Sequence, residues 1–115
     1  MSTADCVFCK IVAGVLPAEV LGRTERALAF TDLNPQAPFH VLVVPLEHHD
    51  NAAASAAADP ASIGHVVALA DEVAHAAGHS DYRMIVNTGA GAGQTVFHTH
   101  VHVLAGSTGM TDALI

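Results

Sequence analysis

The fold is decided by residues 98–104, which read His98-Thr99-His100-Val101-His102-Val103-Leu104. Three histidines occupy alternate positions, with β-branched residues between them. In an extended strand alternate side chains share a face, so the three imidazoles would stand in a row with a spacing of about 6.5–7 Å. In a helix His100 would point away from the other two histidines, and the β-branched neighbours would disfavour that conformation. The pattern therefore predicts a strand with three imidazoles on one face.

Such a face makes a poor core, because each imidazole has two ring nitrogens that need partners. One interpretation is a metal site, and another is an imidazole nucleophile that attacks phosphorus. The loop from Gly89 to Gly93 directly precedes the strand, and its backbone N–H groups, with Gln94 and Thr95, suit an anion. A Gly/Ala loop is also common as a plain connection. Because no acidic residue lies in the loop or strand, the nucleophile interpretation is favoured.

The rest of the chain predicts an α+β fold with an antiparallel sheet of about five strands. A short helix is expected over residues 7–13, with Asp5 as N-cap and Gly14 as its stop. One long helix is expected over residues 60–77, after the N-cap Asp59. The further expected strands cover residues 18–23, 27–31, 39–44 and 82–86, and residues 50–58 form a loop or a short helical turn. A single domain over residues 1–115 is expected.

Charge and hydropathy exclude several partners. Four Lys and Arg residues stand against eleven Asp and Glu residues, for a formal net charge of −7. A nucleic-acid partner is not expected, because counterion release needs a basic surface that four cations cannot make. The chain has no apolar run of about 18 residues and no secretory signal at its start, so we expect a cytoplasmic protein without a membrane partner.

Cys6 and Cys9 are the only cysteines, and two residues separate them. Their spacing fits half of a zinc site and equally fits two reduced structural thiols. His40 lies just inside the strand over residues 39–44, and it would join the other imidazoles if that strand is their neighbour. His48 gains interest only if the two cysteines bind zinc.

The histidine-rich stretch resembles the His-φ-His-φ-His-φ-φ motif of the histidine triad (HIT) superfamily, where φ is apolar and Thr99 is a mild departure. Residues 6–14, 30–45 and 93–97 look like the Hint branch of that superfamily, so the resemblance covers nearly the whole chain in order. It implies the HIT fold, in which the sheet, one long helix and one short helix form a domain whose sheet extends across a homodimer.

The resemblance implies a hydrolase that cleaves purine nucleoside 5'-phosphoramidates or related nucleoside monophosphate derivatives. His100 would attack the α-phosphorus and form a nucleotidyl-histidine intermediate, which water then hydrolyses. His102 would bind a phosphoryl oxygen, His98 would support the network, and His40 would be an additional active-site histidine. Thr95 would contact the phosphate or the leaving group. The implied nucleotide-binding residues are Phe30, Asp32, Leu33, Asn87, Gly93, Gln94, Thr95, His100 and His102.

Bacterial relatives with an N-terminal Cys-x-x-Cys often hold a structural zinc ion, and the corresponding ligands here are Cys6, Cys9, His48 and His98. No catalytic metal is implied. Three departures affect specificity: Thr31 replaces a histidine near the base, Leu46-Glu47 replaces a basic pair, and residues 106–115 lack a Trp-Pro element. Alternative functions are a dinucleoside polyphosphate hydrolase, a nucleotidyl transferase of the superfamily, and a non-catalytic nucleotide-binding scaffold.

Overall fold

The computed structural model describes residues 3–106, so most of the C-terminal segment in which we noted the missing Trp-Pro element lies outside the described residues. The elements follow in the order η1 (Thr3–Asp5), α1 (Val7–Val12), β1 (Val20–Arg23), β2 (Ala27–Thr31), β3 (Phe39–Pro45), α2 (Ala52–Ala58), α3 (Pro60–Ala76), β4 (Arg83–Ile85), η2 (Ala90–Ala92) and β5 (Val101–Ala105). Among residues 3–106, no helix is both long and apolar enough to span a membrane.

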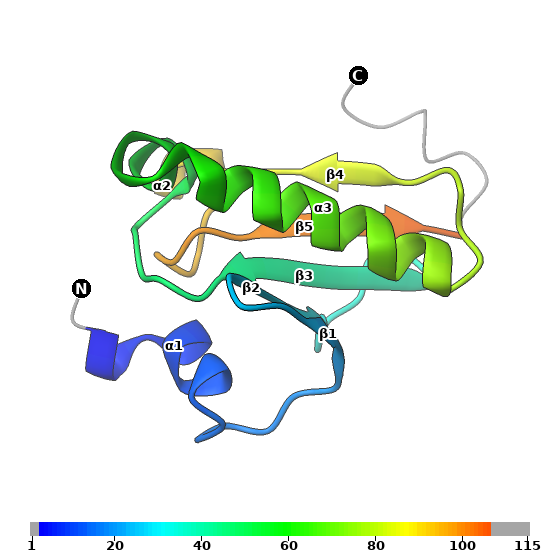
Figure 1. Cartoon of the computed structure of the whole chain (residues 1–115), viewed down its shortest axis with the longest axis horizontal. Helices are drawn as coiled ribbons and strands as arrows, with labels where there is room; N and C mark the ends of the chain where they lie inside the picture. Colours follow the sequence, from blue (N-terminus) through cyan, green and yellow to red (C-terminus); the bar gives the residue numbers. More distant parts are fainter. Residues whose placement is uncertain (1–2, 107–115) are drawn as a thin grey trace.

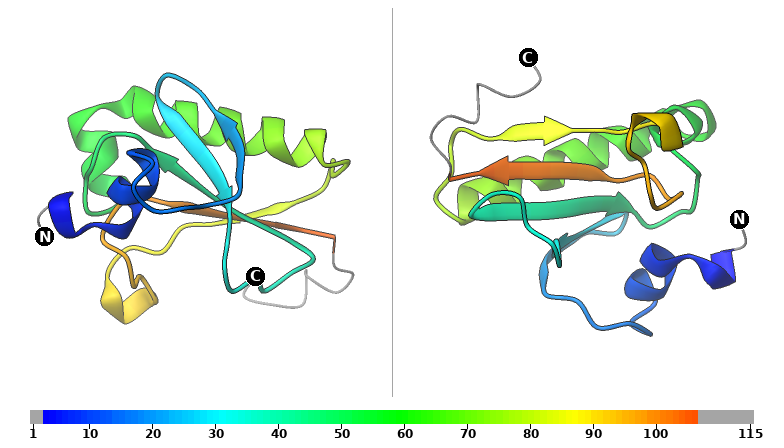
Figure 2. Two further views of the ribbon diagram at one scale, coloured as in Figure 1. Left: turned by 90° about the horizontal axis from the view of Figure 1, so that it is seen from below. Right: turned by 180° about the vertical axis from the view of Figure 1, so that it is seen from behind.

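Five strands form one sheet in the order β1-β2-β3-β5-β4, and every neighbouring pair is antiparallel. This confirms the predicted α+β class and the five-stranded antiparallel sheet. Helix α3 crosses one face of the sheet, and α1 lies on the other side near the end of β2 (Figures 1 and 2). The sheet therefore has two differently covered faces, and the histidines lie on the face opposite α3.

Alternation along the strands builds a separate apolar cluster on each face. Toward α3, residues such as Val41 and Val103 pack against Val66 and Leu69. On the opposite face, Leu28, Phe30, Leu42 and Val44 pack around Cys6 and Phe8 of the N-terminal segment. Because the side chain of Phe8 is buried there, α1 is held beside the histidines rather than free of the sheet.

Helix α3 begins and ends where the sequence predicted, within one residue. The Asp59 side chain accepts a hydrogen bond from the backbone N–H of Ala61 at 3.2 Å, and Pro60 occupies the first turn. At the other end Gly78 adopts a φ of 89°, a left-handed conformation that ends the helix at little steric cost.

Two local predictions differ from the structure. Asp5 is not the N-cap of α1, because it lies in η1 and the Sγ atom of Cys6 accepts the capping hydrogen bond from Cys9 N–H instead. Residues 52–58 form the helix α2, for which Asn51 is the N-cap through a 2.9 Å bond from Ala54 N–H. The domain thus has a third α-helix beside the long and the short one that were predicted.

The predicted histidine strand is also shorter than expected, because β5 begins at Val101. The register pairs Val43 with Val101, which places Pro45 opposite Thr99. Proline has no N–H to donate to the ladder, and the carbonyl of Pro45 lies 2.9 Å from Nε2 of His98. Only His102 of the three histidines therefore belongs to a strand, and the prediction of three evenly spaced imidazoles on one strand was wrong.

Candidate active site and metal centre

A cleft of about 230 Å³ opens on the sheet face opposite α3. Its polar lining comprises Thr31, Asp32, Thr95, His100 and His102. Its apolar lining comprises Val7, Phe8, Ile11, Pro17, Ala18, Phe30, Leu33, Leu42 and Val96. The cleft thus joins two imidazoles to an apolar slot between α1 and the end of β2, a combination that suits a ligand with a polar end and a flat apolar end.

His100 lies at the polar end of the cleft, just before β5. Its Nδ1 atom is 2.8 Å from the carbonyl oxygen of His98. Because that oxygen only accepts, Nδ1 carries the proton of the neutral ring and Nε2 keeps its lone pair. Burial lowers the pKa of His100 below its usual value of 6.5, so the neutral form is the stable one near neutral pH. The ring can therefore act as a nucleophile through Nε2.

His102 belongs to a chain of hydrogen bonds that begins at a backbone amide. The N–H of Gln36 donates to Nδ1 of His40 at 2.9 Å, so the proton of a neutral His40 lies on Nε2. That Nε2 atom is 2.9 Å from Nδ1 of His102 and 3.3 Å from a carboxylate oxygen of Asp32. If His102 Nδ1 accepts, its Nε2–H is a donor toward the cleft. Burial, followed by the nearby His100 and His40, lowers the pKa of His102.

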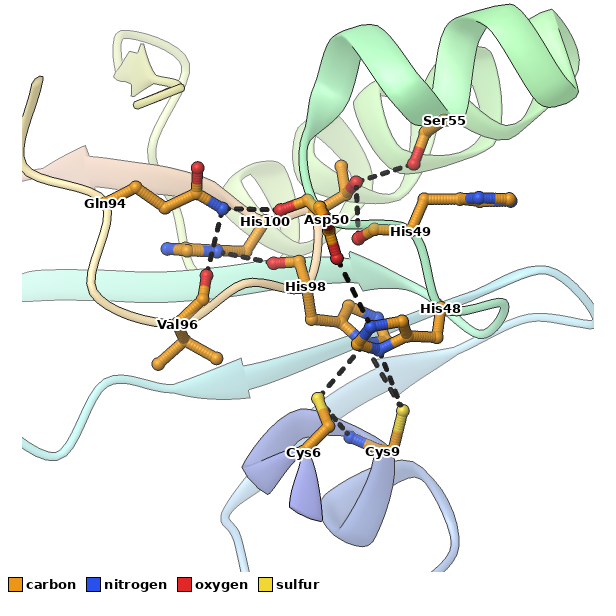
Figure 3. A network of polar contacts seen from close by, with 11 residues as sticks. Cys6, Cys9, His48, His49, Asp50, Ser55, Gln94, Val96, His98 and His100 are labelled. Carbon is orange, nitrogen blue, oxygen red and sulfur yellow. Dashed lines mark hydrogen bonds and ion pairs between the residues drawn. The ribbon is translucent and has the colours of Figure 1, made fainter. Parts of the chain in front are cut away.

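His98 turns away from the cleft toward the cysteines (Figure 3). Its Nδ1 atom lies 3.5 Å from both Cys6 Sγ and Cys9 Sγ, and 3.2 Å from Nδ1 of His48. The Sγ atom of Cys9 is 3.3 Å from that same nitrogen of His48. These four side chains come from α1, from the segment after β3 and from the segment before β5, and their ligand atoms all lie within 4.8 Å of one another.

Four of the six distances between these ligand atoms are close to the edges of a zinc coordination tetrahedron. Zn–N bonds of about 2.0–2.1 Å and Zn–S bonds of about 2.3 Å in tetrahedral geometry require N···N edges near 3.3 Å and N···S edges near 3.6 Å. The observed N···N distance is 3.2 Å, and the observed N···S distances are 3.3–3.5 Å. The hydrogen bond to Pro45 fixes the tautomer of His98, since Nε2–H donates and leaves Nδ1 free to bind a metal.

The protonation states of His98 and Cys9 also suit a metal cation at this position. Burial lowers the pKa of His98 to about 4, so its ring is neutral at neutral pH, as a metal ligand must be. Burial and a hydrogen bond with Cys6 raise the pKa of Cys9 to about 11, so its thiolate requires a neighbouring positive charge. Nε2 of His48 is buried without a hydrogen bond, with a carboxylate oxygen of Asp50 at 3.7 Å.

Several N–H groups of the loop over residues 89–94 bond to carbonyl oxygens of the loop itself, which the sequence did not indicate. Gly89 and Gly93 adopt positive φ values of 90° and 97°. The N–H groups of Ala92 and Gln94 bond to the carbonyl of Gly89 at 3.1 Å, and that of Gly93 bonds to Ala90 at 3.1 Å. The side chain of Gln94 donates to the carbonyls of Asp50 and Val96 and accepts from Gly89 N–H. These bonds hold the loop in shape and use several of the donors that we expected to face an anion, including the side-chain amide of Gln94.

Of the predicted site residues, the cleft brings together Phe30, Asp32, Leu33, Thr95, His100 and His102. His40 lies behind His102 as described. Asn87, Gly93 and Gln94 are outside the lining, and a phosphate contact for them stays a prediction. Sequence reasoning missed Ser55, whose buried hydroxyl lies 2.6 Å from that of Thr99. Thr99, a polar residue at an apolar position of the motif, was the signal that such a partner exists.

Comparison with known proteins agrees with this geometry. The sequence profile described as "HIT domain" matches residues 13–109. An uncharacterized HIT-like protein of Synechocystis sp. is 43% identical over 103 residues, which cover 89% of this chain and 90% of that protein. The structure of a HIT family hydrolase from Clostridium thermocellum has a TM-score of 0.89 and 40% identity, over 95% of this chain and 96% of the other.

A second similar structure is that of a histidine triad protein from Clostridium difficile, with a TM-score of 0.88 and 38% identity over 94% of this chain and 96% of the other. The sequence match and the structural matches each span most of both proteins. This chain belongs to the HIT domain family.

Proposed function

We propose that this protein is a nucleotide-binding hydrolase that cleaves purine nucleoside 5'-phosphoramidates or related nucleoside monophosphate derivatives. The single observation that carries the proposal is the 2.8 Å contact between His100 Nδ1 and the carbonyl of His98. It leaves the lone pair of Nε2 on a neutral ring that lines the cleft. The similarity to the HIT family hydrolase from Clostridium thermocellum supports the same class of activity.

In the proposed reaction Nε2 of His100 attacks the α-phosphorus, and the bond from phosphorus to the leaving nitrogen or oxygen breaks as the new N–P bond forms. The leaving group takes a proton from solvent and departs, with the hydroxyl of Thr95 placed at the cleft to contact it or the phosphate. Water then attacks phosphorus and returns a proton to solvent, the N–P bond breaks, and the nucleoside monophosphate is released with the ring of His100 restored. His102 donates through Nε2–H to a phosphoryl oxygen in both steps.

The opposite end of the cleft suits a nucleoside. Phe30 and Leu33 offer apolar surface to a base, and Leu33 is 95% exposed although it lies at the lining, so it has room to gain contacts when a ligand binds. The carboxylate of Asp32 lies between this apolar surface and the imidazoles, where it would accept hydrogen bonds from ribose hydroxyls.

The cluster of Cys6, Cys9, His48 and His98 would hold a structural zinc ion. When bound, zinc would cross-link α1 to the segments that flank the sheet, and it would supply no chemistry to the cleft. We also propose a single domain over residues 1–115, a cytoplasmic location and a homodimer. The edge strand β4 supports the dimer, because Met84 within it and Val86 directly after it are exposed at 39% and 46%.

The test is a substrate panel with adenosine and guanosine 5'-phosphoramidates and diadenosine polyphosphates, with product formation followed by chromatography. We expect the wild type to hydrolyse the phosphoramidates fastest. His100→Ala should abolish turnover and still bind AMP, and His65→Ala, an exposed residue of α3, should keep full activity. Unchanged turnover in His100→Ala would overturn the nucleophile assignment. A preference for diadenosine substrates would favour the dinucleoside polyphosphate hydrolase, and no turnover of any compound would favour the scaffold.

A further inference from the structure

The hydroxyls of Thr99 and Ser55 form a buried pair behind the histidines. Both residues have 0% exposure, and their oxygens are 2.6 Å apart. Ser55 belongs to α2, so this contact joins that helix to the segment between two of the site histidines (Figure 3). A hydroxyl buried without a partner is costly, so two that meet in the core form a specific contact rather than general packing.

The hydrogen bonds of the pair run in one direction. Thr99 Oγ1 donates to the carbonyl oxygen of His49 at 3.3 Å. A hydroxyl has a single proton, so Ser55 must donate to Thr99 when Thr99 donates to His49. The backbone N–H of Thr99 bonds to the same carbonyl at 2.9 Å. The side chain and the main chain of Thr99 thus both donate to the carbonyl oxygen of His49.

The hydrogen bonds of Thr99 matter because residues 98–100 lie outside the sheet. Strand β5 begins at Val101, and its ladder with the neighbouring strand β3 ends at the pair of Val43 and Val101. The peptide at residues 98–100 is therefore held by the bonds of Thr99 and by the ring of His98. The carbonyl of His98, which precedes Thr99 directly, is the acceptor for Nδ1 of His100. A shift of Thr99 would move that acceptor and the Cα atom of His100 together.

We propose that Thr99 and Ser55 are a positioning pair for His100: their buried hydroxyl contact fixes the peptide that presents the His98 carbonyl to the nucleophile. The proposal rests on the proposed function, since it assigns a purpose to the geometry of His100. Neither residue lines the cleft, so neither touches a substrate. The hydroxyl of Thr99, rather than its shape, is the acting group.

Valine has the shape of threonine without the hydroxyl, so Thr99→Val separates positioning from packing. It leaves Ser55 without its acceptor and keeps the backbone bond to His49. Because a small misplacement of reacting groups costs much of the rate, we expect kcat per folded molecule to fall about tenfold or more, with KM within about twofold of wild type. Thr99→Ser keeps the hydroxyl and should restore most of kcat.

Three further variants complete the test. Ser55→Ala should lower kcat in the same way as Thr99→Val, and the double variant should fall little further, because both changes remove one contact. The matched control is Ser62→Ala. Ser62 is also buried near α2, donates to the carbonyl of Asp59 at 2.8 Å and lies 3.5 Å from the carbonyl of Ser55, without contact to the histidine segment. It should change stability and leave kcat unchanged.

The second readout does not depend on turnover. NMR of protein labelled with ¹⁵N-histidine should show a slowly exchanging Nδ1–H proton of His100 in the wild type and in Thr99→Ser, and faster exchange in Thr99→Val. Equal kcat and equal exchange in wild type and Thr99→Val would overturn the positioning role. If the wild type hydrolyses nothing while the exchange difference is present, the proposed function fails and the positioning of the ring stands.

Discussion

Nε2 of His40 lies 2.9 Å from Nδ1 of His102, and this contact determines which nitrogen of His102 is left for the cleft. The backbone N–H of Gln36 occupies the other nitrogen of His40, so the proton of a neutral His40 lies on Nε2, where His102 at 2.9 Å is a nearer acceptor than the Asp32 carboxylate at 3.3 Å. One amide on the loop before β3 therefore sets the tautomers of two imidazoles in sequence.

Replacing His40 by alanine should weaken phosphate binding without removing the nucleophile. We expect kcat/KM to fall about 10-fold or more, because His102 then loses the donor that holds its Nε2–H toward the cleft. AMP affinity, measured by calorimetry, should fall with it. His75→Ala is the control, since His75 is exposed on α3 and pairs with Asp71. Wild-type AMP affinity in His40→Ala would contradict the tautomer chain.

The pH dependence follows from the lowered pKa of His100. Its neutral ring is the nucleophile, so activity should be lost as pH falls through a pKa below the usual 6.5 and should be constant from about pH 6.5 to 8. The carboxylate of Asp32 raises this pKa and opposes the larger effect of burial.

Removing that charge should extend activity to lower pH. In Asp32→Asn the acidic limb of the kcat/KM profile is expected to move to lower pH, because the pKa of His100 falls. This shift is expected even if the loss of ribose contacts lowers the maximum rate. A limb that moves to higher pH would show that another group controls it.

Zinc content tests the metal centre directly. Elemental analysis of purified protein should give about one zinc per chain, and His48→Ala should lose it, because one corner of the tetrahedron is missing. His49→Ala is the matched control, since its ring lies outside the cluster, near Glu47, and the contact with Thr99 uses its backbone carbonyl. Metal loss should lower the midpoint of thermal unfolding, because α1 is then no longer cross-linked to the sheet. Wild-type protein without zinc after purification in zinc-containing medium would refute the assignment.

Asp59 carries two contacts at the start of α3. Its side chain caps the helix and also pairs with Arg26, a contact whose partners are each about one-third exposed. Asp59→Ala should lower the free energy of unfolding by about 1–2 kcal/mol, mainly through the lost cap. Arg26→Ala should cost about 0–1 kcal/mol, because a partly exposed ion pair contributes little. Urea denaturation measures both, and an equal loss in the two variants would mean that the ion pair dominates.

Periodicity and end signals in the sequence were sufficient for most of the fold. Asp59, Pro60 and Gly78 mark the boundaries of the long helix in the sequence, and in the structure α3 runs from Pro60 to Ala76. The sequence does not decide between a loop and a helical turn over residues 50–58, because an alanine-rich stretch has high helix propensity but no amphipathic pattern to show which side it buries. In the structure the buried side of α2 is the one that carries Ser55, whose hydroxyl contacts that of Thr99.

The candidate site was predicted less completely, because its geometry depends on contacts between distant segments. Alternation suggested one row of imidazoles, and the end of the ladder between β3 and β5 at Val43 and Val101 could not be predicted from residues 98–104 alone. The resemblance to a known family supplied the grouping of Cys6, Cys9 and His48 with His98, and the structure brings their ligand atoms together. The amide of Gln94 donates to the carbonyls of Asp50 and Val96, contacts between segments that the sequence pattern does not indicate, and its contact with a phosphate stays a prediction.

The acceptor for His100 is a main-chain oxygen, and every amino acid has one. No atom of the side chain at position 98 takes part in that bond, although the ring of His98 also bonds to Pro45 and so helps to hold the peptide. A residue at position 98 that cannot bind a metal would therefore keep the same acceptor for the neighbouring imidazole, provided that other packing holds the peptide and α1 in place. The same independence offers protein engineers a position at which the stability of the domain can be redesigned separately from its chemistry.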